Sequence, residues 1–158
     1  MVLENLVLRL AGISHHFGEI DEASRRSMIN LVRKAKSSIK IVSGELNFDF
    51  YSYDGLLDAL KEAIEKGVVV KCIIGPNPNK ESFKMLTRLK GCAYFYQLPE
   101  WPDFHFTLID DKHARLEAPH TPGQKVRDEY IIHNFKDVEE LKERFDKLEK
   151  LAVPVETA

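Results

Sequence analysis

Residues 103–120, DFHFTLIDDKHARLEAPH, combine a clear strand pattern with the chain's densest group of chemically active side chains. Apolar and polar residues alternate over residues 104–109, which is the period of a half-buried strand. Asp110 and Asp111 predict a tight turn, because aspartate tolerates the backbone angles that turns need. Residues 112–117 alternate again. The stretch therefore predicts a β-hairpin that carries a candidate site.

The rest of the chain alternates short apolar runs with amphipathic segments of helical period. Asp54 is a candidate N-cap and Gly67 a candidate C-cap for one helix, and Asp137 begins the last helix. The order predicts one α/β domain with a mixed, mostly parallel sheet flanked by helices. The predicted strands are residues 39–43, 68–74, 92–98 and 129–134, and the predicted helices are residues 21–37, 55–67, 79–89 and 137–151.

Composition fits a globular domain of ordinary size, with 158 residues, 44% of them hydrophobic and 30% charged. A net charge of -2 gives no support for a strong nonspecific grip on nucleic acid. No apolar run approaches the roughly 20 residues of a membrane span. The first residues lack the pattern of a signal peptide, so we expect a cytoplasmic protein. Cys72 and Cys92 lie in apolar runs and are predicted to be buried thiols.

A second group of polar residues follows the first predicted strand. Gly44, Glu45 and Asn47 come directly after residues 39–43. In open α/β sheets, ligands bind beyond the carboxyl ends of the strands. Glu45 and Asn47 are therefore candidate ligand-binding residues.

The order of elements from about residue 21 to residue 151 resembles the phospholipase D superfamily in its small, single-motif form. The resemblance implies a division into residues 1–20 as an N-terminal arm or edge element, residues 21–152 as a phospholipase D-like domain and residues 153–158 as a tail. The segments that carry the resemblance are AKSSIKIVSGELNF (35–48), GLLDALKEAIEKGVVVKCIIG (55–75) and NFKDVEELKERFDKLEKL (134–151).

The signature of that superfamily is H-x-K-x4-D, often followed by G-S-x-N. With the IDDK segment set on the family's usual hairpin turn, Asp103 takes the histidine position, His105 the lysine position and Asp110 the aspartate position. The glycine, serine and asparagine positions are then occupied by Glu117, Ala118 and His120.

A shifted register would make His105 the histidine, with Thr107 in place of the lysine and Lys112 in place of the aspartate. Neither register gives an intact motif. In the family, a histidine attacks phosphorus, a second copy protonates the leaving oxygen and a lysine steadies the phosphate oxygens. Asp103 would be a poor nucleophile toward a phosphodiester, because the two anions repel each other. His105 carries a positive charge only when it is protonated.

The resemblance thus leads to the hypothesis of a degenerate, non-catalytic domain that binds a phosphate-bearing or other anionic ligand in a regulatory or sensing role. Dimers of the family pack their motif-bearing sides together, which implies a homodimer here. The candidate ligand-binding residues are Glu45, Asn47, Asp103, His105, Lys112, His113 and His120, with Asp110 as an orienting partner.

Two rival hypotheses stay open. One is a divergent phosphodiesterase or nuclease that acts as a dimer on nucleic acid or a small phosphodiester, with His105, Asp110 and His120 as catalytic residues. The other is a protein-interaction module. The histidine and aspartate spacing matches no standard zinc pattern, so we expect no metal and no cofactor.

Trp101 belongs to an aromatic group between residues 94 and 106. These rings either pack in the core or, through Trp101 and a tyrosine, form a stacking wall for a base or sugar ring.

Overall fold

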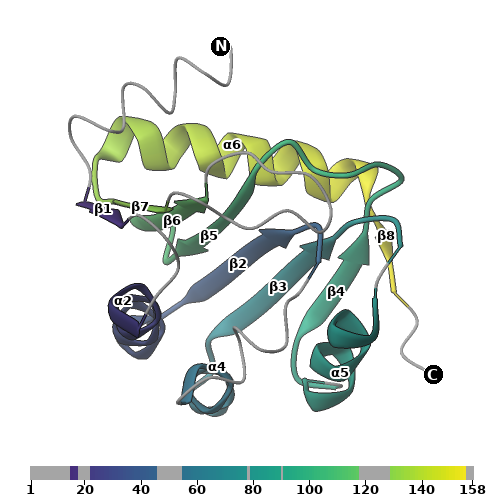
Figure 1. Cartoon of the computed structure of the whole chain (residues 1–158), viewed down its shortest axis with the longest axis horizontal. Helices are drawn as coiled ribbons and strands as arrows, with labels where there is room; N and C mark the ends of the chain where they lie inside the picture. Colours follow the sequence, from purple (N-terminus) through teal and green to yellow (C-terminus); the bar gives the residue numbers. More distant parts are fainter. Residues whose placement is uncertain are drawn as a thin grey trace.

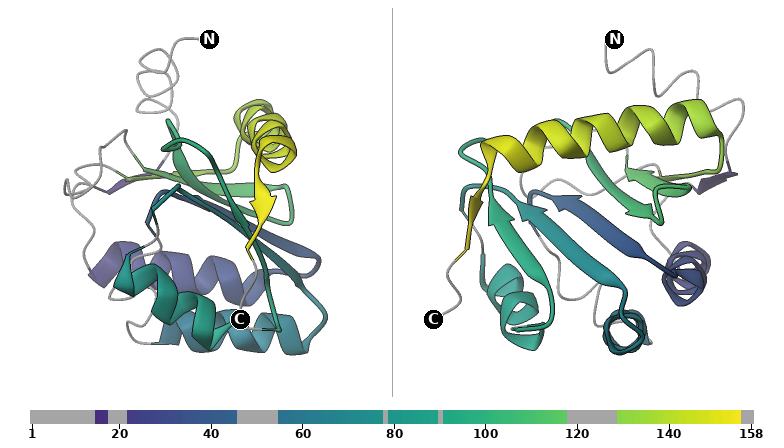
Figure 2. Two further views of the ribbon diagram at one scale, coloured as in Figure 1. Left: turned by 90° about the vertical axis from the view of Figure 1, so that its right-hand side faces the viewer. Right: turned by 180° about the vertical axis from the view of Figure 1, so that it is seen from behind.

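The computed structural model describes residues 15–17, 22–45, 55–77, 79–89, 91–117 and 129–155. These residues form one β-sheet with eight strands in the order β1-β7-β6-β5-β2-β3-β4-β8. Helices α2, α4 and α5 cover one face of the sheet and α6 crosses the other, as Figures 1 and 2 show. The predicted α/β domain with a mixed sheet flanked by helices is confirmed.

The elements follow the predicted alternation of strands and helices, with boundaries that differ by a few residues. Within the described ranges, no helix is both long and apolar enough to cross a membrane. The strands are β1 His15–Phe17, β2 Ser38–Ser43, β3 Val69–Ile74, β4 Tyr94–Gln97, β5 His105–Ile109, β6 His113–Glu117, β7 Glu129–Ile132 and β8 Val153–Pro154. The helices are α2 Glu22–Lys34, α4 Leu56–Glu65, α5 Lys80–Arg88 and α6 Phe135–Leu151.

The sheet is less parallel than we predicted. β2, β3 and β4 are parallel neighbours. The hairpin strand β5 pairs antiparallel with β2, and the pairing continues antiparallel through β6 and β7 to β1. At the other edge, β8 pairs antiparallel with β4. β1 lies at one edge of the sheet, within the predicted N-terminal arm or edge element, and β8 extends the other edge into residues that the prediction assigns to the tail.

Alternation along each strand gives the sheet two apolar layers. Ile39, Ile41 and Val70 face α2 and α4, whereas Phe106 and Leu108 face α6. Each large side chain buried in this way contributes roughly 1.5–3 kcal/mol. The alternating sequence of β5 predicts a half-buried strand. This prediction is wrong, because all five residues of β5 are buried. β5 lies in the middle of the sheet, where helices cover both of its faces.

The N-cap residues of two helices differ from the prediction. Gly55, with φ 98°, is the N-cap of α4, while Asp54, our candidate, lies outside the described residues. α6 begins two residues before Asp137, because the Asn134 side chain accepts the backbone N–H groups of Lys136 (2.9 Å) and Asp137 (3.4 Å). An asparagine N-cap leaves Asp137 buried in the first turn.

The two cysteines also differ from each other. Cys72 is buried in β3, and burial raises the pKa of its thiol to about 12. Cys92 is exposed, so the prediction of two buried thiols is correct for Cys72 and wrong for Cys92. Cys92 lies before β4 begins at Tyr94, outside the buried part of the predicted strand.

The turn between β5 and β6 consists of Asp110 and Asp111. Both have positive φ, 55° and 52°, and the Lys112 N–H donates to the Ile109 carbonyl at 3.0 Å. Such two-residue turns match the twist of antiparallel strands, and aspartate tolerates this left-handed conformation. The predicted hairpin and its turn are thus present at the predicted residues.

The Asp110 carboxylate joins this turn to the beginning of β2. It accepts hydrogen bonds from the backbone N–H groups of Lys36 (3.0 Å), Ser37 (2.7 Å) and Ser38 (3.0 Å). The Ser37 hydroxyl donates a further bond at 2.9 Å. Burial alone would raise the pKa of Asp110, but these hydrogen bonds outweigh burial and lower the pKa below its usual value. Asp110 therefore has a structural role.

We expect Asp110→Ala to lower the free energy of unfolding by about 2–4 kcal/mol, because three backbone N–H groups lose their acceptor and alanine is strained at positive φ. Asp110→Asn keeps an acceptor and tolerates this φ, so it should cost about half as much. The lowered pKa means that the carboxylate stabilises the fold above pH about 4, and this stabilisation is lost as the pH falls through the folded-state pKa. Urea unfolding at pH 7 and pH 3 measures both effects. Equal stability of wild type and Asp110→Ala at pH 7 would contradict this role.

Candidate functional site

The hairpin spans the sheet from the carboxyl end of the parallel strands to their amino end. Phe106 lies opposite Val42 near the end of β2, and Ile109 lies opposite Ile39 near its beginning. His105 is therefore at the carboxyl end, whereas the Asp110 turn is at the amino end. His105 precedes Asp110 by five positions of extended chain, which corresponds to roughly 17 Å.

Four polar side chains gather at the carboxyl end on the sheet face that carries α2 and α4. His105 and Thr107 come from β5, and Arg115 and Glu117 come from β6. Antiparallel pairing sets His105 opposite Glu117 and Thr107 opposite Arg115. We call these four residues the carboxyl-end cluster.

An ion-pair network connects the carboxyl-end cluster. Arg115 Nη1 lies 2.7 Å from Glu117 Oε1, and His105 Nδ1 lies 3.5 Å from Glu117 Oε2. The exposed fractions of the side chains are 3% for Arg115, 4% for His105 and 13% for Glu117. Charges buried so deeply need partners, and the shared carboxylate supplies one for the guanidinium. Glu117 is the most exposed of these three ionisable side chains.

Trp101 lies beside this cluster, with the centroid of its ring 5.1 Å from that of His105. The indole lies so close to Gly44, just after β2, that a Cβ at this position would collide with it. Gly75, just after β3, donates its N–H to the Gly44 carbonyl at 3.1 Å. The two glycines allow the indole to lie against the backbone at the carboxyl ends of β2 and β3. Trp101 is half-buried and forms a ring surface next to His105.

The predicted site residues do not form one pocket. His105 and Glu45 lie at the carboxyl end, and Asp103 is exposed two residues before His105. Lys112 and His113 follow the turn at the amino end. Asn47 and His120 lie outside the described residues. The predicted site residues are separated because β5 and β6 run from the carboxyl end of the parallel strands to their amino end, with predicted site residues at both ends.

Arg115 and Glu117 are not among the predicted site residues, whereas Trp101 is predicted either to pack in the core or to form a stacking wall. A signal was available for the first two. With residues 110 and 111 as a two-residue turn, cross-strand pairing sets Glu117 opposite His105 and Arg115 opposite Thr107. Side chains opposite each other share a face. The burial of that face was not foreseeable, because its polar residues suggested exposure to solvent.

At the amino end, two further polar pairs lie on the hairpin. Lys40 Nζ is 3.0 Å from the Asp111 carboxylate and 5.5 Å from the centroid of the Phe145 ring. His113 Nδ1 lies 2.7 Å from His133 Nδ1. Burial, the neighbouring His113 and the charge of Lys34 together lower the pKa of His133. Among the described residues, no group of three or more histidine, cysteine, aspartate or glutamate side chains is arranged to hold a metal ion.

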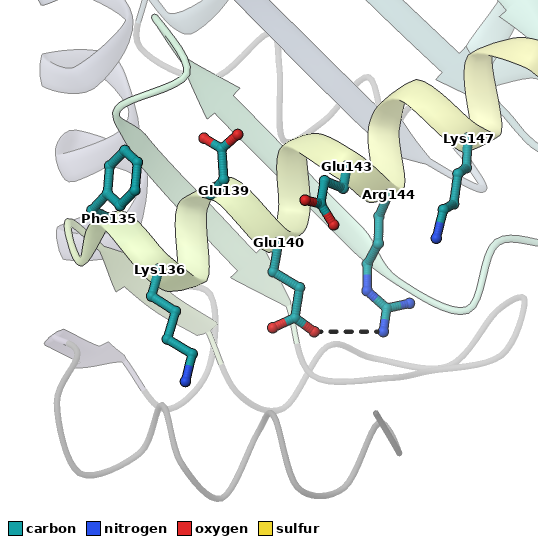
Figure 3. A pocket seen from close by; sticks show the side chains of 7 residues that line it. All are labelled: Phe135, Lys136, Glu139, Glu140, Glu143, Arg144 and Lys147. Atoms are coloured by element: carbon teal, nitrogen blue, oxygen red, sulfur yellow. Dashed lines mark ion pairs between the residues drawn. The ribbon is translucent and has the colours of Figure 1, made fainter.

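A separate hollow of about 740 Å³ lies along the outer surface of α6 (Figure 3). The Glu140 and Arg144 side chains approach to 3.8 Å within it, and the Arg144 guanidinium lies 4.3 Å from the centroid of the Phe104 ring. Three acidic and three basic side chains line the hollow. Its lining therefore has no net charge that would favour an anion or a cation. The lining residues are Phe135, Lys136, Glu139, Glu140, Glu143, Arg144 and Lys147.

Comparisons with known proteins identify the fold. No family model and no curated protein sequence matches the chain. Among solved structures, it is similar to Nuc from Salmonella typhimurium, a phospholipase D family member, with a TM-score of 0.72 and 15% identity over 91% of this chain and 99% of that one. NucT from Helicobacter pylori gives a TM-score of 0.68 and 16% identity over 90% of this chain and 98% of that one.

A third similar structure is TrmBL2, described as an archaeal chromatin protein with a novel mode of DNA binding. Its TM-score is 0.65, with 17% identity over 96% of this chain and 61% of the TrmBL2 chain. At these identities the likeness defines the fold alone. The chain therefore has a phospholipase D-like fold, as the sequence resemblance had implied.

Because Trp101 is the only tryptophan of the chain, its fluorescence reports on the contact with Gly44. We expect Gly44→Ala to push the indole outward, move its emission maximum to longer wavelength and lower the free energy of unfolding by about 1–3 kcal/mol. Gly67→Ala is the matched control. A Cβ at this position meets nothing within 4 Å, although the alanine backbone must keep a φ of 89°. The control should cost about 1 kcal/mol without changing the emission. Unchanged emission in Gly44→Ala would show that the indole does not rest on Gly44.

Proposed function

We propose that this phospholipase D-like domain binds an anionic, phosphate-bearing ligand at the carboxyl-end cluster and does not turn it over. The observation that carries the proposal is the buried Arg115–Glu117–His105 network at the carboxyl end of the parallel strands. Arginine presents several N–H donors in a planar fork that matches phosphate and carboxylate oxygens. Ligands of open α/β sheets bind at this end of the strands.

The charges of the carboxyl-end cluster determine which group an incoming anion has to displace. Glu117 already neutralises Arg115, with 2.7 Å between the paired atoms. An incoming anion must therefore compete with the Glu117 carboxylate for the guanidinium. His105 shares that carboxylate and contributes a further N–H donor to the same place. The ring of Trp101 provides an adjoining surface for the apolar part of a ligand.

The same residues argue against efficient phosphodiester hydrolysis. Asp103 stands at the position of the family's nucleophilic histidine, and it is exposed and anionic. A carboxylate approaching a phosphodiester is repelled by it. His105, at the lysine position, shares the Glu117 carboxylate with Arg115. The described cluster thus has groups suited to holding an anion, whereas positions 103 and 105 of the motif carry neither the family's histidine nucleophile nor its lysine.

The proposal extends to the setting of the domain. We propose a homodimer in the cytoplasm, with a regulatory or sensing role, in which the motif-bearing sides of two copies face each other. Similarity to TrmBL2 suggests nucleic acid as one class of phosphate-bearing ligand, and a small phosphorylated molecule is the other.

Two substitutions in the network should change phosphate affinity in opposite directions. Arg115→Gln removes a charge-assisted donor and should weaken binding of inorganic phosphate by about 10- to 100-fold. Glu117→Gln removes the competing carboxylate and should strengthen binding by about fivefold. Isothermal titration calorimetry measures both affinities, and the fluorescence of Trp101 provides a second readout.

Controls separate a local effect from unfolding and from total charge. Lys112→Gln removes one positive charge at the amino end and should leave phosphate affinity unchanged. The double variant Arg115→Gln/Glu117→Gln removes both partners and so avoids leaving one buried charge unpaired. Equal weakening by Lys112→Gln and Arg115→Gln would refute a site at the carboxyl-end cluster, as would the absence of phosphate binding to the folded wild type.

The enzymatic rival makes a different prediction. We expect the purified chain to leave single-stranded DNA and a chromogenic phosphodiester uncleaved above the background of His105→Ala. Gel electrophoresis and absorbance follow the two substrates, and sedimentation velocity on the same sample records whether two copies associate. Robust cleavage by the wild type that disappears in His105→Ala would replace the binding proposal with a phosphodiesterase.

A further inference from the structure

Two histidines meet at the amino end of the sheet, far from the carboxyl-end cluster. His113 is the first residue of β6, and His133 directly follows β7. These strands are antiparallel neighbours, with Ala114 opposite Ile132, so the next pair outward is His113 and His133. Their ring centroids are 4.8 Å apart and the ring planes are inclined by 76°.

The contact between the rings has a specific chemistry. The two Nδ1 atoms are 2.7 Å apart, a hydrogen-bond distance. A hydrogen bond between two nitrogens requires that one of them present a lone pair while the other carries the proton. When the donor ring instead carries its proton on Nε2, both Nδ1 atoms present a lone pair. Two nitrogens that share a proton can share a metal ion in its place.

Distances select the kind of ion. A metal about 2.0 Å from each nitrogen separates adjacent ligands by about 2.8 Å in a square-planar arrangement and about 3.3 Å in a tetrahedral one. The observed 2.7 Å lies closer to the first value. Imidazole suits Cu²⁺ and Ni²⁺, which favour tetragonal geometry, and Cu²⁺ heads the order of divalent affinities.

Access and protonation also suit a metal ion. His133 is exposed and His113 is half-buried, so an ion can reach the pair from solvent. Metal binding requires the neutral ring, which is the usual form of an imidazole at pH 7.5. Lys34 is the positive charge that opposes a cation here. β6 holds His113, and His133 directly follows β7.

We propose that His113 and His133 form a two-histidine site for a tetragonal divalent transition-metal ion, Cu²⁺ or Ni²⁺ in preference to Zn²⁺. As the ion binds, the ring that carried its proton on Nδ1 takes the tautomer with the proton on Nε2, so both rings stay neutral and the two Nδ1 atoms become protein ligands of the ion. The remaining coordination positions are open to water or to an external ligand. The site is independent of the proposed anion binding, because the two lie at opposite ends of the hairpin.

The test uses the full chain without an affinity tag. Titration calorimetry with Ni²⁺ at pH 7.5 should give one ion per chain, and His113→Asn and His133→Asn should each weaken binding at least tenfold. The electron paramagnetic resonance spectrum of the Cu²⁺ complex should show hyperfine splitting from two imidazole nitrogens. A saturating ion should also raise the melting temperature of the wild type by mass action, and not that of His133→Asn.

Two consecutive histidines, His15 and His16, provide a control. His15→Asn/His16→Asn removes the two histidines of β1, which lie opposite Ile131 and Tyr130 of β7, and should leave the Ni²⁺ affinity unchanged. Unaltered affinity in both His113→Asn and His133→Asn, or loss of binding in the His15/His16 variant alone, would overturn the proposal. Tighter binding of Zn²⁺ than of Ni²⁺ would overturn the tetragonal assignment. Because His133 is exposed, His133→Asn should fold, which circular dichroism checks.

Discussion

The bond between the Asp110 carboxylate and the backbone of residues 36–38 is the constraint on which the sheet depends. Three consecutive N–H groups at the beginning of β2 converge on this one carboxylate. The backbone adds to it, because the Asp110 N–H donates to the Ser38 carbonyl at 2.8 Å. The contact fixes the register between β2 and β5, the pair at which the parallel half of the sheet meets the antiparallel half. A shift of one residue would exchange the two faces of β5.

This register decides which side chains can act together. His105 and Thr107 share a face with Arg115 and Glu117, while Phe106 and Leu108 point to α6. The polar members of β5 are thus buried beside the α2 and α4 layer instead of reaching solvent. Burial strengthens the attraction between Arg115 and Glu117 and raises the cost of leaving either one unpaired. The carboxyl-end cluster is therefore a buried polar feature that depends on this register, and it is the place at which we propose anion binding.

The sequence predicts the order of elements well because hydrophobic period depends on local residues. The predicted hairpin turn at Asp110 and Asp111 is confirmed, since turn geometry is set by the turn residues themselves. Helix starts are less predictable: Asn134 and Asp137 are both good N-cap residues, and the hydrogen bonds that the Asn134 side chain accepts place the start of α6. The strand β5 has an alternating sequence, but its neighbours on both sides of the sheet bury it.

The candidate site was harder to predict for a physical reason. Matching residues to a motif assigns roles along one strand, whereas a site is built across strands. Asp110 fits the motif, yet its carboxylate is occupied by backbone N–H groups at the amino end. Arg115 lies outside the motif, yet it brings a permanent positive charge to the face of His105. The cross-strand pairing of His105 with Glu117 connects the two, and it follows from turn length.

A guanidinium on the neighbouring strand is not equivalent to a lysine in the motif. Lysine offers a mobile point charge, while arginine offers a planar fork that keeps its charge at any physiological pH. Arg115 is also held by Glu117, so its charge is committed until an anion competes for it. A cation held in this way can exchange one anionic partner for another, but it is poorly placed to follow charge that moves during a reaction. This difference is the physical basis on which we propose reversible recognition of an anion in place of transition-state stabilisation.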